Sequence, residues 1–277
     1  MALIKPEVFA PLVREKFEGN IRVAKLATNL GYLTNTNVGE TVTFPKWSVL
    51  SDAEDVVKGT AIGTEELNQT SSQATIKMVA PKGTMIYDMD NLTMLGNAIN
   101  EAATQHGIVI ARKVDKDLIA DALTSPLKSA TEKGNAITAQ EMLNALTLYG
   151  DNRDVETFAG IVINSLLLPS FIAMDEFTSM EKTYTNGGNG IVRGGLAGYF
   201  LGIPVYLSDH GTYDATTNEC ITLIIKKNSL GFMTKRDINT EEKREPEYKR
   251  TTIFSDMIYA THLLADDGIV VVRKTIV

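Results

Sequence analysis

The sequence is poor in the residues that build oxidised, zinc-bound or membrane-spanning proteins. Cys220 is its only cysteine among 277 residues, so a disulfide within the chain and a cysteine-rich zinc site are both excluded. No apolar run approaches the roughly 18 residues needed to cross a bilayer, and charged residues interrupt the first segment, MALIKPEVFAPLVREKF. We therefore expect a soluble, unsecreted protein from a reducing compartment, with no membrane contact.

An excess of basic residues is also missing. The chain has 27 Lys+Arg against 34 Asp+Glu, a net charge of −7, and both halves share the deficit: residues 1–150 carry 14 basic and 17 acidic side chains, residues 151–277 carry 13 and 17. An acidic chain meets a phosphate backbone with repulsion, which disfavours tight binding of nucleic acid by the chain as a whole. With 44% hydrophobic residues, the composition is that of a folded protein.

Few residues are placed for catalysis. The three histidines, His106, His210 and His262, lie in no metal-binding or catalytic motif. We interpret His106 and His262 as structural and His210 as part of a turn. Cys220 lacks the sequence context of a nucleophile and is interpreted as a small buried hydrophobe. No G-x-S-x-G sequence is present for a serine nucleophile.

The remaining candidates also have simple structural explanations. Two acidic pairs could bind a divalent cation, but they lack an EF-hand pattern and suit helix starts and turns: Asp88 with Asp90, and Asp266 with Asp267. The segment 185–202 contains seven glycines, but Arg193 stands where a dinucleotide-binding fingerprint needs its third glycine. The sequence therefore predicts no catalytic, cofactor-binding or metal-binding residues.

A charged run occupies residues 235–250. Its basic side chains alternate with acidic ones, so its local net charge is close to zero and it would hold phosphate poorly. Two interpretations stay open: salt bridges to a partner surface of the same kind, or a merely solvated face.

The first ninety residues predict an arm and a long hairpin. Residues 1–30 combine two prolines with a helical stretch near 13–27 and show no continuous apolar face. Strand-like alternation at 41–44 and 74–78 brackets a polar, acidic insert at 48–72 that cannot bury itself. Because long irregular loops in compact domains are usually functional or disordered, we expect a hairpin that projects to meet another molecule.

Helices dominate the middle of the chain and strands its end. Apolar spacing predicts a helix over 97–124, about 40 Å long, and Thr138 with Glu141 forms a capping box for a helix to about residue 149. A shorter helix is expected near 165–174. Strand patterns follow at 160–163, 203–207, 221–226, 251–260 and 268–273. This order favours an α+β fold over regular βαβ units.

This organisation resembles the major capsid proteins of tailed phages, which have the Hong Kong 97-type fold. The matching motifs are N-I-R-V-A at 20–24, G-E-T-V-T-F-P-K-W at 39–47 followed by D-A-E-D at 52–55, A-R-K-V-D-K-D-L at 111–118, and G-I-P-V-Y-L-S-D at 202–209. The resemblance covers essentially the whole chain.

The resemblance implies a division into domains. It assigns an N-terminal arm to 1–38, an extended loop in the form of a long β-hairpin to 39–88, a peripheral domain to 89–136 and 236–277 with a spine helix at 97–124, and an axial domain to 137–235. The C-terminal strands are expected to return to the peripheral sheet.

The resemblance also implies a function without catalysis or cofactors. It implies a coat subunit that forms hexamers and pentamers of an icosahedral head around double-stranded DNA, with no sequence-specific contact to it. The extended loop would lie across the adjacent subunit. Because the sequence starts at the arm, we expect scaffolding to come from a separate protein or to be dispensable. A portal protein is also expected, and we assign no cross-link to Lys46 or Lys58. The expected location is the virion capsid, after synthesis in the host cytoplasm.

Three other functions are weighed against the coat protein. An encapsulin-like shell would share the fold but hold an enzyme as cargo. A soluble hydrolase would use His106 or His262, and a sugar- or peptide-binding module would use the glycine-rich segment as a monomer. A coat subunit lacking residues 50–70 is expected to fold but to fail to form closed particles.

Overall fold

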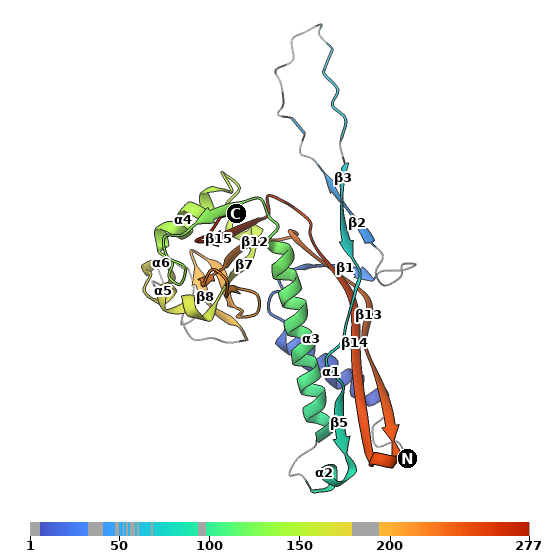
Figure 1. The fold of residues 1–277 in the computed structure, drawn as a ribbon. Coiled ribbons are helices and arrows are strands. Elements are labelled where there is room, and N and C mark those ends of the chain that lie inside the picture. Colours follow the sequence, from blue (N-terminus) through green and yellow to red (C-terminus); the bar gives the residue numbers. More distant parts are fainter. Residues whose placement is uncertain are drawn as a thin grey trace.

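The chain forms an elongated body, a compact lobe beside it and a long hairpin that projects away from both, as the computed structural model shows (Figure 1). The structure describes residues 6–32, 41–47, 50, 51, 53, 55, 59, 61–67, 69–93, 98–178 and 194–276. These residues form both helices and strands, and most strand pairs are antiparallel, so the α+β class is confirmed.

Two helices pack together in the elongated body: the 25-residue α3 (Ala98–Ala122) runs along it, and α1 (Pro6–Asn20) lies across α3 (Figure 1). Phe9, Val13 and Phe17 of α1 recur every four residues and are buried in the same core as α3. This spacing gives α1 a continuous apolar face. The expectation that the first thirty residues lack such a face is therefore wrong, and the helix also begins and ends earlier than expected. The expected spine helix at 97–124 agrees with α3 to within two residues at each end.

The backbones of the two helices come close together at Gly107 of α3. A Cβ atom on Gly107 would lie 2.7 Å from the carbonyl oxygen of Val13 and 2.9 Å from the backbone nitrogen of Phe17. Any side chain at this position would push α1 away from α3. The sequence uses glycine here because the helix backbones come into contact.

A long antiparallel hairpin, β13 (Leu230–Glu245) with β14 (Arg250–Leu263), forms the other layer of the elongated body (Figure 1). Its turn is the short helix η3 (Pro246–Tyr248). The sheet order is β1-β13-β14-β4, and β5 also pairs with β14. The shorter elements are β1 (Thr28–Tyr32), β4 (Lys77–Val79), β5 (Thr84–Tyr87) and α2 (Asp88–Thr93).

The projecting hairpin consists of β2 (Thr41–Trp47) and β3 (Gln69–Thr75), paired in antiparallel register from Thr41 with Thr75 to Trp47 with Gln69. This confirms the expected pair of strands around a long insert. Its base is anchored because Phe44 is buried with Ile258 and Ala260 of β14.

The compact lobe is a six-stranded sheet in the order β6-β15-β12-β7-β9-β8 with short helices packed on it. Its strands are β6 (Lys128–Ala130), β7 (Phe158–Ile163), β8 (Leu196–Phe200), β9 (Ile203–Leu207), β12 (Thr222–Lys226) and β15 (Ile269–Arg273). Its helices are α4 (Ala139–Thr147), η1 (Val155–Thr157), η2 (Ser165–Leu167), α5 (Leu168–Ile172) and α6 (Asp175–Thr178), and β10 (Tyr213–Asp214) pairs with β11 (Glu219–Cys220). The predicted capping box of Thr138 and Glu141 is present at the start of α4.

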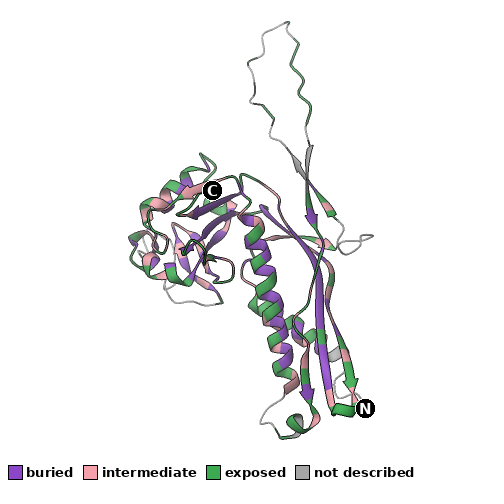
Figure 2. Ribbon diagram, in the orientation of Figure 1, coloured by how far each residue is buried: buried purple, intermediate pink, exposed green. Residues whose placement is uncertain are grey.

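The lobe's sheet contributes to both hydrophobic cores of the molecule. Because side chains of a strand alternate between faces, Leu223 and Ile225 of β12 belong to the core that contains α1 and α3, whereas Ile224 belongs to the core under α4 to α6. Strands β7 and β15 divide in the same way. Figure 2 shows these strands buried, in contrast to the exposed tip of the projecting hairpin.

The last strand, β15, does not lie in the sheet in which we expected it. We expected the strands of 236–277 to return to one sheet with β13 and β14, but β15 pairs with β12 and β6 in the lobe. That expectation is wrong for β15, and β6 likewise places residues expected in the peripheral domain in the lobe's sheet. The run Ile-Val-Val-Val of β15 is apolar on both faces, which suits a central strand covered on both sides.

No helix in the described part of the chain is long and apolar enough to span a bilayer.

Candidate assembly surfaces

The tip of the projecting hairpin is open to solvent at its described residues. Every residue described between 50 and 67 is exposed, including the apolar Leu50, Ile62 and Leu67, of which Ile62 is 75% exposed. Across the hairpin the backbone N–H of Ser51 donates to Glu65 at 2.9 Å, and this bond lowers the pKa of the Glu65 carboxyl. The tip thus presents apolar and acidic side chains that its own chain does not cover.

A second surface lies where the arm, α3 and the lobe meet. The buried carboxylate of Asp115 on α3 accepts the backbone N–H groups of Arg22 and Ala24, each at 2.9 Å. Burial raises the pKa of Asp115, although these hydrogen bonds oppose the shift. The guanidinium of Arg22 in turn donates to the carbonyl oxygen of Leu207 at the end of β9, at 2.7 Å.

This joint brings together three of the motifs that carried the family resemblance. Arg22 comes from N-I-R-V-A, Asp115 from A-R-K-V-D-K-D-L and Leu207 from G-I-P-V-Y-L-S-D. The first two meet through a backbone-to-carboxylate bond and the first and third through a side-chain-to-carbonyl bond. The motifs therefore encode one junction between the body and the lobe.

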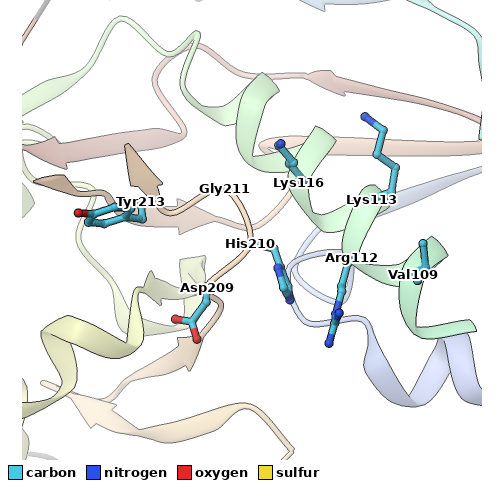
Figure 3. Close-up of a pocket in the computed structure, with 8 residues that line it drawn as sticks. All are labelled: Val109, Arg112, Lys113, Lys116, Asp209, His210, Gly211 and Tyr213. Atoms are coloured by element: carbon cyan, nitrogen blue, oxygen red, sulfur yellow. The ribbon is translucent and has the colours of Figure 1, made fainter. Parts of the chain in front are cut away.

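Next to this joint is a cavity of about 390 Å³, which we call the basic pocket: Val109, Arg112, Lys113, Lys116, Asp209, His210, Gly211 and Tyr213. Figure 3 shows that α3 supplies Arg112, Lys113 and Lys116, while the loop after β9 supplies Asp209 and His210. Lys113 is bound to Asp117 at 2.6 Å, and Asp209 accepts the backbone N–H of Ser165 at 2.8 Å. The pKa of His210 is lowered by burial and by the charges of Arg112 and Arg22, against the opposing effect of Asp209.

Sequence reasoning missed the basic pocket. The signal was available in part, because Arg112, Lys113 and Lys116 are close enough in sequence to share one side of a helix. Their meeting with His210, which comes from a loop about a hundred positions further along, required the fold.

A third surface is the far end of the elongated body, where α2 meets the turn of the β13–β14 hairpin (Figure 1). Arg244 donates to both oxygens of Asp88, at 2.7 and 2.6 Å, and this bidentate pair lowers the pKa of the Asp88 carboxyl. Arg250 pairs with Glu245 and lies over the ring of Tyr248, which is 62% exposed. Several charges of the run 235–250 therefore pair within the chain.

The structure gives the histidines structural positions. His106 is almost fully buried, and its two ring nitrogens contact the hydroxyls of Thr84 and Ser255 at 2.8 and 2.9 Å. His262 stacks on Phe44 at the base of the projecting hairpin, with ring centroids 5.3 Å apart. His210 lies in the loop that follows β9. These contacts agree with the interpretation of His106 and His262 as structural side chains, which stays a prediction.

The other candidates are likewise part of the framework. Cys220 is buried in the lobe's core with its sulfur 3.4 Å from Oδ1 of Asn135, and burial raises the pKa of its thiol. Asp267 lies in the turn before β15, as expected. Within the described residues, no group of three or more His, Cys, Asp or Glu side chains is arranged to hold a metal ion. The segment 188–193 lies outside the described residues.

The sequence of the chain matches no family model. A curated protein, the major capsid protein of Staphylococcus phage phiMR11, is 28% identical over 271 residues, which cover 98% of this chain and 93% of that protein.

Several solved structures share the fold of this chain. The capsid structure of the cyanophage P-SCSP1u superposes with a TM-score of 0.66 at 16% identity, covering 91% of this chain and 88% of that one. The mature capsid of bacteriophage PhiM1 gives a TM-score of 0.61 at 14% identity, covering 93% and 86%. A virus-like particle from Pyrococcus furiosus gives 0.62 at 12% identity, covering 96% and 98%.

Proposed function

We propose that this chain, a major capsid protein with the Hong Kong 97-type fold and a structural rather than catalytic role, forms the hexamers and pentamers of an icosahedral phage head that encloses double-stranded DNA. In this proposal the elongated body is the peripheral domain, α3 is its spine helix, and the compact lobe is the axial domain around the centre of each capsomer.

The exposed tip of the projecting hairpin carries the proposal. Exposing Leu50, Ile62 and Leu67 to water forgoes the favourable burial of about 1.5–3 kcal/mol that each side chain could gain. The anchored base at Phe44 keeps the hairpin pointing away from its own body. A neighbouring copy would cover the tip, and repetition of that contact would link subunits into a lattice.

The size and shape of the purified protein test this proposal. Light scattering with negative-stain electron microscopy is expected to show rings or closed shells. A variant in which a short Gly-Ser turn replaces residues 50–67 keeps β2 and β3, and should fold with an unchanged circular dichroism spectrum yet form no closed particles.

The control for the shortened hairpin is Lys82→Gln with Arg153→Gln, which changes two exposed side chains away from the tip. It should assemble like the parent chain. Closed particles of full size from the shortened hairpin would refute the role of the tip, and a uniform 30.2 kDa monomer from the parent chain, with and without a scaffolding protein, would refute the shell itself.

We further propose a separate scaffolding protein and a portal protein as partners, and synthesis in the host cytoplasm before incorporation into the virion capsid. The net charge of −7 supports a container that holds DNA without sequence-specific contact. Particles isolated from infected cells and treated with nuclease should retain DNA. Sequencing of the DNA fragments that contact the coat protein should show no enriched sequence.

The structural likeness to the Pyrococcus furiosus particle favours one second candidate, an encapsulin-like shell that holds protein cargo. The contents of the particles separate the two functions. Nuclease-protected DNA supports the phage head, whereas a co-purified enzyme in particles without DNA supports the cargo shell.

A further inference from the structure

We propose that the basic pocket is a binding site for a phosphate group, held by Arg112 and Lys116 of α3 together with His210 of the loop after β9. This inference goes beyond the assembly of a shell, and it concerns the single subunit.

The charges of the pocket are not balanced by the chain. Among the described residues, five arginines have a carboxylate partner: Arg14, Arg236, Arg244, Arg250 and Arg273. Arg112 and Lys116 have no such ion pair within the described part of the chain, although the protein carries more acidic than basic residues. Asp209, the one acidic side chain of the pocket, already accepts a backbone N–H group.

The geometry suits a compact, multiply charged anion. Arg112 and His210 come from different elements and extend side by side toward the same side of the pocket in Figure 3, and the charge of Arg112 acts on His210. Lys116 lies one helical turn beyond Arg112 on α3. Its ammonium extends away from the tips of Arg112 and His210 in Figure 3, and its flexible side chain would turn toward the anion on binding. A guanidinium can bind two phosphate oxygens at once, which leaves the third to an ammonium or an imidazole.

A phosphate group fits these donors better than a single carboxylate does. Its oxygens can meet each of the three side chains separately, and its charge of up to about −2 matches two cationic side chains, whereas a carboxylate has two oxygens and a single charge. The pocket of about 390 Å³ has room for the group with water around it. Because the whole chain is acidic, the site would act locally rather than attract a long polyanion from a distance.

Bound phosphate would connect two parts of the fold. Arg112 and Lys116 belong to α3, whereas His210 belongs to the lobe, so the anion would bridge the joint that Arg22 already spans. It would also offset the repulsion between Arg112, Arg22 and a protonated His210. The pocket would thus set how firmly the lobe is held to α3.

Isothermal titration calorimetry of the purified full chain with sodium phosphate at low ionic strength tests the site. Arg112→Gln with Lys116→Gln should weaken binding at least tenfold, and His210→Gln alone should weaken it measurably. The control, Lys82→Gln with Arg153→Gln, makes the same change in net charge outside the pocket and should bind like the parent chain. Circular dichroism checks that each variant is folded.

Two further titrations identify the source of the group. If a short DNA duplex binds the parent chain and the control but not the pocket variant, the site is assigned to phosphates of nucleic acid. If inorganic phosphate alone binds the parent chain and the control but not the pocket variant, the site is assigned to the free anion. Either result supports the proposal.

Three results would overturn the proposal. They are no binding of phosphate or duplex to the parent chain, equal weakening in the pocket variant and the control, and pocket-dependent binding of a peptide of residues 50–67 alone, which would assign the pocket to acidic side chains of another copy. Shell formation is scored separately, so failure of the site and failure of the proposed function are distinguishable.

Discussion

His106 connects α3 to two strands through both of its ring nitrogens, and it does so as a buried side chain. Burial lowers its pKa, so the folded chain resists protonation that the unfolded chain accepts near the ordinary value of about 6.5. As the pH falls through that value, the unfolded state therefore binds more protons and the free energy of unfolding decreases, by about 1.4 kcal/mol for each unit by which the pKa is lowered.

The first prediction concerns this pH dependence. Urea unfolding of the dispersed subunit at pH 7.5 and pH 5.5 should show a loss of stability in the parent chain that is smaller in His106→Gln. Comparing the two chains cancels the contribution of the carboxylates they share. An identical loss in both would mean that His106 does not titrate with unfolding.

The second prediction concerns the close approach at Gly107. Alanine is normally better than glycine inside a helix by about 1 kcal/mol. At Gly107 its Cβ would meet the backbone of α1 at 2.7 and 2.9 Å, so Gly107→Ala should destabilise the subunit by about 1–3 kcal/mol. Gly19→Ala is the control, since a Cβ there meets no atom within 4 Å. Equal melting temperatures for the two variants would contradict the packing of α1 on α3.

Individual residues could be predicted from the sequence only where their partners are close in the chain. The capping box of Thr138 and Glu141 was predicted because it spans three positions. The partners of His106 could not be predicted, because Ser255 is 149 positions away and the contact depends on how β14 packs on α3. The basic pocket could not be predicted for the same reason, because it combines residues of α3 with residues of the loop after β9, which are far apart in the sequence.

Among the elements, the projecting hairpin depends on a small anchor. Phe44 is buried with Ile76 and Ile258 and stacks on His262, while the remainder of the hairpin beyond this base makes few contacts with the body. The anchor is therefore expected to open without unfolding of the main cores.

The third prediction removes this anchor. Phe44→Ala should cost about 3–5 kcal/mol locally and speed proteolytic cleavage in and near residues 41–75 at least tenfold, with the body left intact. Limited proteolysis followed by mass spectrometry measures this. Ile62→Ala, an exposed apolar residue of the same hairpin, should leave the cleavage rate unchanged. Cleavage spread evenly over the chain would mean that the anchor supports the whole fold.

Elements with a strong local pattern were predicted well, and those defined by their partners were not. The alternation at 41–44 and 74–78 and the stripe of α3 were sufficient to place the hairpin and the long helix. The face of α1 was overlooked because few large residues form it, namely the buried Phe9, Val13 and Phe17 with the partly buried Leu12. The sheet of β15 could not be chosen from its sequence, since an apolar strand suits the middle of either sheet.

For the whole molecule, the shared sheet couples the two hydrophobic cores. Ile224 and Ile225 are neighbours in β12, yet they are buried in different cores. Loss of β12 would remove one wall from each core at once. The body and the lobe should therefore unfold together although they look separate in Figure 1.

The fourth prediction follows from this coupling. Differential scanning calorimetry of the dispersed subunit should show one transition whose calorimetric and van't Hoff enthalpies agree. Ile224→Ala and Ile225→Ala should each lower that single transition, since each loses about 2–5 kcal/mol. Two resolved transitions, each shifted by only one of the variants, would show that the cores are independent.

The position of β15 has a consequence for synthesis of the protein on the ribosome. This strand lies between β6 and β12 in the lobe's sheet, but it is made after every other strand of the described chain. Until β15 emerges, β12 pairs with β7 on one side only, and the lobe's core stays open on the other. A nascent subunit without β15 would present an unfinished lobe to its neighbours, so we expect the lobe to become competent for assembly only once this strand is in place.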